Sequence, residues 1–255
     1  MVRPTAQLTL PKSEGAQRFV VGWICNGDVT NQMAASLLDF AIVDGDRAVK
    51  EGRAPRLVGK ISILSSPRIV AARTDMIEAF LLSTDADWLL TIDSDMSFDV
   101  EDLDRLLRCA DPKRRPIVGG LCFGGGRNTP GQPLLIFPTL YRIWTAEDGK
   151  LDSETIKDYP KDKLFEVSAT GAAFMLIHRS VLVAMRETFG KDDNPYPYYS
   201  ELVVRGKPMG EDVAFCIRAA ALGFKTFVHT GVKINHEKRY HLTEALYDET
   251  RARHS

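Results

Sequence analysis

The run WLLTI at residues 88–92 constrains the fold more than any other segment. Apolar side chains occupy every position but Thr91, so a strand formed here has no face suited to water. Strands that are buried on both faces are typical of parallel sheets covered by helices. This run therefore predicts the central strand of an α/β protein.

Predicted strands and helices alternate through the first half of the chain. Short apolar runs predict strands at residues 19–25, 57–64, 88–92 and 116–122. Apolar residues at helical spacing predict helices at residues 31–43, 69–82 and 100–110. In the first of these helices the apolar residues are Met33, Leu37, Leu38 and Ile42. This β-α-β alternation predicts a doubly wound α/β core.

The second half of the chain is less regular. Polar, Pro-rich and Gly-rich composition predicts loops at residues 124–133, 145–163 and 190–210. Between them, residues 164–185 predict a strand, a turn, a strand and a helix. Residues 211–222 predict a helix closed by Gly223, followed by a strand at 225–234 and a helical end. Because long loops in compact domains are usually functional, residues 190–210 are expected to contribute to function.

Charge and cysteine content exclude several classes of protein. With 33 basic and 34 acidic residues, the formal net charge is −1, and nucleic-acid binding would favour a strongly basic face. The four cysteines lack the C-x-x-C spacing of zinc ribbons and redox motifs. We expect them to be free thiols, which fits a reducing compartment: Cys25, Cys109, Cys122 and Cys216.

The N-terminal sequence predicts a flexible tail over residues 1–17 and no secretory signal. No run of about 18 apolar residues occurs, so we expect no transmembrane helix. The predicted location is the cytosol.

Two carboxylates, Asp93 and Asp95, directly follow the buried run at 88–92. Ligands of open α/β sheets bind at the carboxyl ends of the strands. Two carboxylates so close repel each other, and Mg²⁺ or Mn²⁺ removes that repulsion while a diphosphate completes its shell. Helix capping is the structural alternative. Asp99 lies nearer the next helix and is the better cap, which leaves the pair free for a ligand.

A second acidic pair, Glu211 and Asp212, begins the helix predicted at 211–222. Carboxylates at a helix start also interact favourably with the helix dipole, so a structural role is an alternative. In a sugar transfer, either side chain could accept the proton of an acceptor hydroxyl.

Late histidines offer a third metal ligand. His236 could bind the metal, and its imidazole would favour Mn²⁺. His229 and His241 are rivals by spacing, and a role without metal is the structural alternative.

In the 190–210 segment, Tyr196, Tyr198 and Tyr199 could stack on an acceptor sugar or pack the loop onto the core; the sequence favours neither.

Three segments, in order, resemble the GT-A fold glycosyltransferases with a D-x-D motif, in particular family 2-like members. They are RIVAARTDMIEAFLLSTDADWLLTIDSDMSF, SATGAAFMLIHRSVL and GEDVAFCIRAAALGFKTFVHTGVKINH. The likeness extends from about residue 19 to 241. It implies a single GT-A (Rossmann-like) domain at 18–255, with a mostly parallel central sheet flanked by helices. The nucleotide-sugar half would span about 18–123 and the acceptor half about 124–245.

The resemblance also implies roles for individual residues. Asp93, Ser94 and Asp95 match the D-x-D site for metal and diphosphate, and His236 matches the late metal-binding histidine. Glu211 and Asp212 match the acidic pair at the acceptor helix, where Asp212 would be the base of an inverting enzyme. Three further positions would contact the donor: Arg73 at the diphosphate, Asn26 with Gly27 at the base and ribose, and Gly171 beside the sugar. Thr74 departs from the family, since many relatives have Asn there.

The implied enzyme is a hexosyltransferase-type glycosyltransferase that uses a UDP- or GDP-sugar with Mn²⁺ or Mg²⁺. Its acceptor could be a glycan, a protein, a lipid or a modified nucleotide. A nucleotidyltransferase that makes a nucleotide sugar is an alternative, although NGDVTNQM after the first strand lacks the basic residue that holds a triphosphate. A non-catalytic nucleotide-sugar-binding module is the other alternative.

Overall fold

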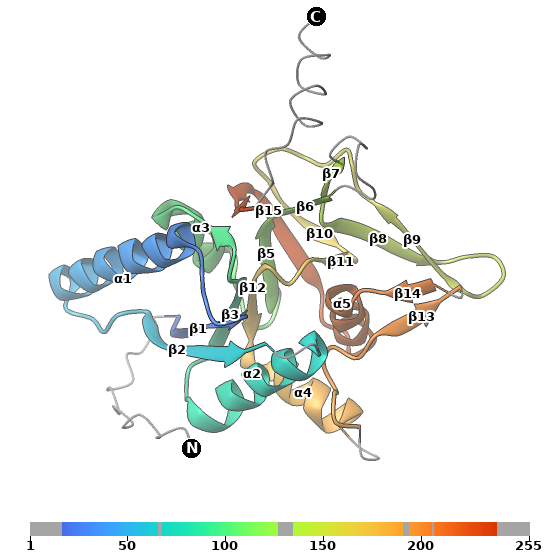
Figure 1. Ribbon diagram of the computed structural model, residues 1–255, viewed down its shortest axis with the longest axis horizontal. Helices are drawn as coiled ribbons and strands as arrows, with labels where there is room; N and C mark the ends of the chain where they lie inside the picture. The colour runs from blue at the N-terminus through green and yellow to red at the C-terminus, as the bar shows by residue number, and fades with distance from the viewer. Residues whose placement is uncertain (1–16, 66–67, 127–134, 191–193, 206, 239–255) are drawn as a thin grey trace, which may run out of the picture.

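The computed structural model describes residues 17–65, 68–126, 135–190, 194–205 and 207–238 (Figure 1). The helices within these ranges are α1 (Asn31–Glu51), α2 (Ile69–Ser83), α3 (Val100–Cys109), α4 (Arg179–Phe189) and α5 (Glu211–Ala221). None of the helices in these ranges is both long and apolar enough to cross a membrane.

A seven-stranded sheet forms the centre of the protein. In spatial order its strands are β10 (Leu164–Val167), β15 (Thr226–Lys233), β5 (Ile117–Leu121), β12 (Phe174–His178), β3 (Trp88–Asp93), β1 (Phe19–Cys25) and β2 (Leu57–Leu64). Strands β2, β1, β3, β5 and β15 run in one direction, whereas β12 and β10 run against it. The expected mostly parallel α/β sheet is therefore confirmed.

Short strands pair outside the central sheet. These pairings are β4 (Met96–Ser97) with β16 (Asn235–His236), β6 (Phe123–Gly126) with β7 (Leu135–Pro138), β8 (Leu140–Thr145) with both β9 (Leu151–Thr155) and β11 (Ala169–Thr170), and β13 (Leu202–Val204) with β14 (Lys207–Met209).

Helices cover both faces of the central sheet (Figure 1). Helices α1 and α3 pack on one face, and α2, α4 and α5 lie on the other. Successive side chains of a strand point to opposite faces, so Leu90 joins the first hydrophobic cluster and Leu89 joins the second. Both are fully buried, which explains why residues 88–92 carry no polar face.

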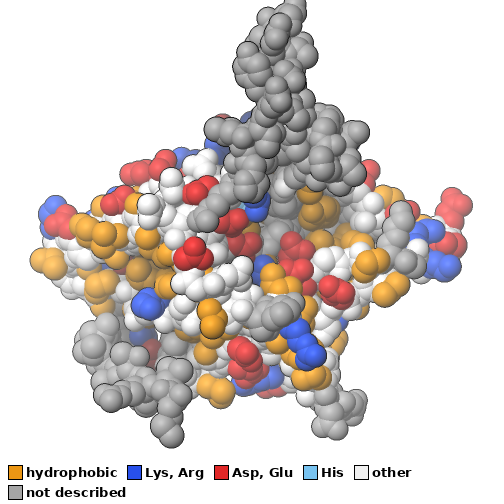
Figure 2. Space-filling view, viewed as in Figure 1, with side chains coloured by type: hydrophobic (Ala, Val, Ile, Leu, Met, Phe, Trp, Pro, Cys, Tyr) orange, Lys and Arg blue, Asp and Glu red, His pale blue; other side chains and the backbone are white. Residues whose placement is uncertain are grey.

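The apolar residues that predicted the first helix do not all face the core: Met33 is buried and Leu37 packs against the first hydrophobic cluster. Leu38 and Ile42 are 61% and 60% exposed, and Val49 is 83% exposed. Hydrophobic side chains accordingly gather on the surface of α1 at the left of Figure 2. The buried face includes polar residues, because the Ser36 hydroxyl accepts a hydrogen bond from the backbone N–H of Phe98. The buried face of this helix thus combines apolar residues, Met33, Phe40 and Ala48, with the polar Ser36 and Asp44.

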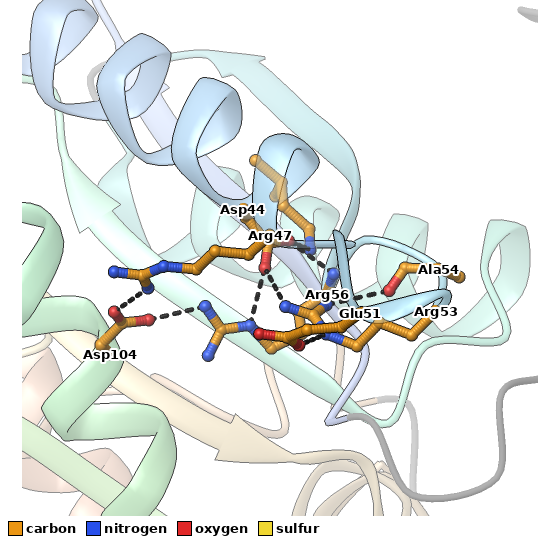
Figure 3. Close-up of polar contacts among 8 residues, drawn as sticks. Asp44, Arg47, Glu51, Arg53, Ala54, Arg56 and Asp104 are labelled. Atoms are coloured by element: carbon orange, nitrogen blue, oxygen red, sulfur yellow. Dashed lines mark hydrogen bonds and ion pairs between the residues drawn. The ribbon is translucent and has the colours of Figure 1, made fainter. Parts of the chain in front are cut away.

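A buried ion-pair network holds α1 against α3 and the start of β2 (Figure 3). Asp44 is 1% exposed and accepts hydrogen bonds from the Arg56 backbone N–H, at 2.6 Å, and guanidinium, at 2.8 Å. The same guanidinium donates to Asp104 on α3 at 2.6 Å, and Arg47 also contacts Asp104. Burial would raise the pKa of Asp44, but the Arg56 hydrogen bonds outweigh it and lower that pKa.

Three predicted loops contain strands. The loop predicted at 124–133 begins with β6 residues, and 127–134 lie outside the described residues. The loop at 145–163 contains β9, and that at 190–210 contains the β13–β14 hairpin. These strands are short and partly polar, so no local apolar run predicts them. They form because they pair with neighbouring strands. The helical end predicted after residue 238 and residues 1–16 of the predicted tail lie outside the described ranges.

Candidate functional site

Strands β1 and β3 bring the first candidate residues to the same edge of the sheet. Ile24 pairs with Asp93 at the carboxyl ends of these parallel strands. The loops that follow are joined, since the Thr30 backbone N–H donates to the Ser94 carbonyl at 2.9 Å. Asp93 and Asp95 are 37% and 33% exposed, so both carboxylates are accessible from this edge. Acidic side chains gather near the middle of the face shown in Figure 2.

Asp95 and His236 are in direct contact. The β4–β16 pairing places His236 opposite Met96, and its Nε2 lies 3.1 Å from Asp95 Oδ2. The other ring nitrogen, Nδ1, lies 2.8 Å from the carbonyl oxygen of Phe123, which orients the imidazole. Lys238 Nζ is 3.0 Å from the same Asp95 oxygen.

These contacts shift the ionisation of both partners. Burial would raise the pKa of Asp95, but hydrogen bonds from His236 and Lys238 outweigh it and lower that pKa to about 2. The hydrogen bond to Asp95 raises the pKa of His236. Each partner therefore favours the charged form of the other.

Arg73 connects the two acidic pairs. It extends from α2, and its side chain is 5% exposed. Nη2 donates a hydrogen bond to Asp93 Oδ1 at 3.3 Å. Nε lies 3.4 Å from Glu211 Oε1, which is within ion-pair range but lacks hydrogen-bond geometry. The guanidinium also lies over the Tyr199 ring, 5.3 Å from its centroid. Burial would lower the pKa of Arg73, but the neighbouring carboxylates outweigh it and raise that pKa.

Asp212 lies in the first turn of α5, where its Oδ1 accepts a hydrogen bond from the Val213 backbone N–H at 2.8 Å. Burial, and secondarily the negative charge of Glu211, raises the pKa of this carboxyl. A Cβ added at Gly171 would lie 3.4 Å from Asp212 Oδ2 and 3.2 Å from Thr139 Oγ1. A glycine therefore leaves room beside the carboxylate that any side chain would fill.

Asn26 and Gly27 lie at the carboxyl end of β1, as the sequence predicts, and both are exposed. Gly27 has φ of 112°, a backbone conformation that favours glycine. The residues that follow them face Asp95 across a cavity of about 240 Å³. Its lining is Asp28, Val29, Thr30, Ser94, Asp95, Glu237 and Lys238.

The predicted metal ligands are only partly assembled. Among the residues that the structure describes, no group of three or more His, Cys, Asp or Glu side chains is spaced to hold a metal ion. Asp95 and His236 are in contact, whereas the Asp93 carboxylate faces Arg73. Carboxylate oxygen and imidazole nitrogen nevertheless suit Mn²⁺, and Mg²⁺ often binds through one or two carboxylates together with substrate phosphates and water. The residues present fit a metal of this kind.

The structure also separates the alternatives that the sequence left open. Asp99 caps α3 in a capping box with Asp102, as predicted. His229, on β15, accepts a hydrogen bond from the Gly231 backbone N–H, and His241 lies outside the described residues. Tyr198 and Tyr199 are fully buried, so they pack the segment onto the core. Tyr199 stacks on Phe215 at 4.8 Å.

Sequence reasoning missed several residues of this site. Lys238 is two positions beyond His236, and its positive charge beside a predicted metal ligand was the available signal. Thr139 and Tyr141 come from a segment with no recognisable motif. Burial raises the pKa of Tyr141, and the charge of Asp212 adds to the effect.

A separate cavity of about 870 Å³ lies away from these residues. It is lined by parts of β8, β9 and β10 and by the far half of α5, and it contains none of the candidate side chains. The candidate acidic residues therefore lie at the edge of the sheet and outside this cavity.

No protein-family model matches the chain, and no curated protein matches its sequence. Among solved structures, the chain is similar to A197 from STIV, with a TM-score of 0.50 and 17% identity over 87% of this chain and 86% of that one. It is also similar to GalNAc-T7 crystallised with UDP, GalNAc and Mn²⁺, with a TM-score of 0.51 and 12% identity. That match covers 89% of this chain and 45% of GalNAc-T7. Identities this low show the fold alone, and the fold is GT-A-like, as expected.

Proposed function

We propose that this protein is a metal-dependent glycosyltransferase that transfers a sugar from a UDP- or GDP-sugar to a hydroxyl-bearing acceptor. The contact between Asp95 and His236, beside Asp93 at the carboxyl edge of β3, carries the proposal. The GT-A-like fold supports it, because GalNAc-T7 with the same fold was crystallised with UDP, GalNAc and Mn²⁺. In this proposal the D-x-D residues Asp93, Ser94 and Asp95, together with His236, form the metal and diphosphate site.

The donor would lie along the edge formed by β1 and β3. Asn26 and Gly27 would contact the base and ribose, and Gly171 would leave space beside the sugar. A bound Mn²⁺ or Mg²⁺ would neutralise the charge that develops on the departing nucleoside diphosphate. The buried Arg73 would hold Asp93 and Glu211 in place and add a fixed positive charge near the diphosphate.

Asp212 would act as the base of an inverting transfer. The acceptor oxygen would attack the anomeric carbon as the bond to the diphosphate breaks, and the hydroxyl proton would pass to the Asp212 carboxylate. Efficient bases have a pKa closer to the working pH, and burial beside Glu211 raises the pKa of Asp212 in that direction. We place the nucleotide-sugar half at about 18–123 and the acceptor half at about 124–245 within the proposed domain, 18–255. The cytosol is the proposed compartment, consistent with four free cysteines.

The experiment is release of nucleoside diphosphate from a panel of UDP- and GDP-sugars, with Mn²⁺ and with EDTA. We expect turnover of at least one donor, stimulated by Mn²⁺ and lost in Asp95→Asn. Glu154→Gln is the matched control, because Glu154 is 51% exposed and pairs with Arg142. No turnover of any donor, or turnover indifferent to both EDTA and Asp95→Asn, would contradict the proposal.

A further inference from the structure

One oxygen of Asp95 receives two cationic partners. His236 Nε2 is 3.1 Å from Asp95 Oδ2, and Lys238 Nζ is 3.0 Å from the same atom. The lysine side chain is 41% exposed, whereas the histidine side chain is 18% exposed. Lys238 is therefore the partner with freedom to move, and the imidazole is the fixed one.

The backbone that carries Lys238 is held in place. The Glu237 N–H donates to the Asp95 carbonyl at 2.9 Å, and the β4–β16 pairing fixes the two residues before it. The position of the Lys238 backbone is thus tied to the loop that carries Asp95. Only the side chain needs to turn for the ammonium to leave the carboxylate.

An ammonium group and a divalent cation compete for this carboxylate. Their like charges repel, and the repulsion grows as water is excluded from the site. A small divalent cation binds its oxygen ligands at short, nearly fixed distances, so a metal on Asp95 Oδ2 would lie close to the ammonium now 3.0 Å from that oxygen. Metal binding at Asp95 would therefore be weaker while Lys238 stays on this carboxylate and stronger once the ammonium moves away.

The structure offers the displaced ammonium a place to go. Lys238 and Asp95 line the cavity of about 240 Å³ described above, together with the carboxylates of Asp28 and Glu237. Glu237 Oε2 is buried and has no hydrogen-bond partner, so it is an available acceptor. In this inference the lysine exchanges the carboxylate of Asp95 for that of Glu237.

We propose that Lys238 occupies the metal position on Asp95 when no metal is bound. Because a divalent cation competes with this ammonium for the carboxylate, the presence of Lys238 lowers the affinity of the protein for divalent cations. The inference rests on the proposed function, because it assumes that Asp95 is a metal ligand. Lys238 then sets the metal affinity without being a metal ligand itself.

The test is the affinity of the full chain for Mn²⁺, measured without nucleotide from the electron paramagnetic resonance signal of free Mn²⁺. We expect Lys238→Met to bind Mn²⁺ about fivefold more tightly than the unsubstituted protein, the factor that corresponds to loss of one partly exposed ion pair. Lys238→Arg, which keeps the charge, should behave like the unsubstituted protein. Lys225→Met is the matched control, because Lys225 pairs with Glu166 at 2.9 Å and both side chains are exposed.

A Lys238→Met protein that binds Mn²⁺ no more tightly than the unsubstituted protein overturns the inference, and this includes the case in which neither binds. An equal gain in Lys225→Met also overturns it, since the effect would then be one of net charge. Donor turnover by the unsubstituted protein is measured separately. Failure of the inference alone therefore leaves that turnover intact, whereas failure of the proposed function abolishes it.

Discussion

The guanidinium of Arg73 on α2 lies 3.3 Å from the carboxylate of Asp93 at the end of β3. The cation is buried, and its ε nitrogen faces Glu211 at the start of α5. One side chain therefore spans the two acidic pairs that the sequence singles out. Because charges buried without a partner are strongly unfavourable, this contact links the stability of the fold to the geometry of the candidate site.

Replacement of Arg73 tests this link. Arg73→Met leaves Asp93 and Glu211 without their shared cation, and we expect the free energy of unfolding to fall by about 3 kcal/mol. Urea denaturation at neutral pH measures the change. Arg142→Met is the control, because Arg142 is 63% exposed and its ion pair with Glu154 should contribute about 1 kcal/mol or less. Equal losses in the two variants would show that Arg73 has no special role.

Removal of the proposed base should affect turnover more than binding. Asp212→Asn keeps the shape of the side chain but cannot accept the acceptor proton, so we expect kcat to fall by about 10²- to 10⁴-fold. The affinity for nucleoside diphosphate should remain within about twofold, since the energy lost belongs to the transition state. Steady-state kinetics and calorimetry on the same preparations check both parts. An Asp212→Asn enzyme with unchanged kcat would exclude this residue as the base.

Substitution of Gly171 tests whether the space beside Asp212 is needed for turnover. The added methyl group of Gly171→Ala would crowd Asp212 Oδ2 and Thr139 Oγ1, so we expect a loss of at least tenfold in kcat. Gly45→Ala is the contrasting variant. A Cβ at Gly45, inside α1, meets nothing within 4 Å, and alanine should stabilise the helix by about 0.5–1 kcal/mol without changing kcat. A Gly171→Ala protein as active as Gly45→Ala would contradict the proposed crowding.

The network around Asp44 predicts a pH dependence of stability. The folded-state pKa of Asp44 is below its ordinary value of 3.8, so the unfolded chain binds this proton more readily. The stabilisation is therefore complete above that value and is lost as the pH falls through the folded-state pKa. At neutral pH, Asp44→Asn should lose about 3 kcal/mol, because Arg56 stays buried without its full charge partner.

The difference in stability between the unsubstituted protein and Asp44→Asn should narrow as the pH falls below about 4. Urea denaturation across this range measures it. Asp46→Asn is the control, since Asp46 is 58% exposed and should change stability little at any pH. A difference that stays constant with pH would show that the Asp44 charge is not the source of the stabilisation.

The sequence predicted the elements whose signals are local. The fully apolar run at 88–92 became β3, with both faces buried, and the helical spacing at 69–82 became α2. Asp99 capped α3 because its position just before the helix fixes that role. The positions of Asp93, Asp95 and Asp212 at the sheet edge and helix start followed from the same local patterns.

Features that depend on distant partners could not be predicted in this way. Leu38 and Ile42 are exposed despite their helical spacing, because the buried face of α1 includes Asp44, which is satisfied by Arg56 just before β2. Likewise, the pairing that carries Lys238 to Asp95 joins segments far apart in the chain. No periodicity or spacing in a single sequence encodes such a contact.

The central claim is that Asp93 and Asp95 gather around a divalent cation that binds the diphosphate of the donor. Calorimetric titration of UDP and GDP into the protein, with Mn²⁺ and with EDTA, tests it most directly. We expect at least one nucleotide to bind about tenfold or more tightly with Mn²⁺, and Asp95→Asn to abolish that difference. Nucleotide affinity that is the same with Mn²⁺ and EDTA, or unaltered in Asp95→Asn, would contradict the account.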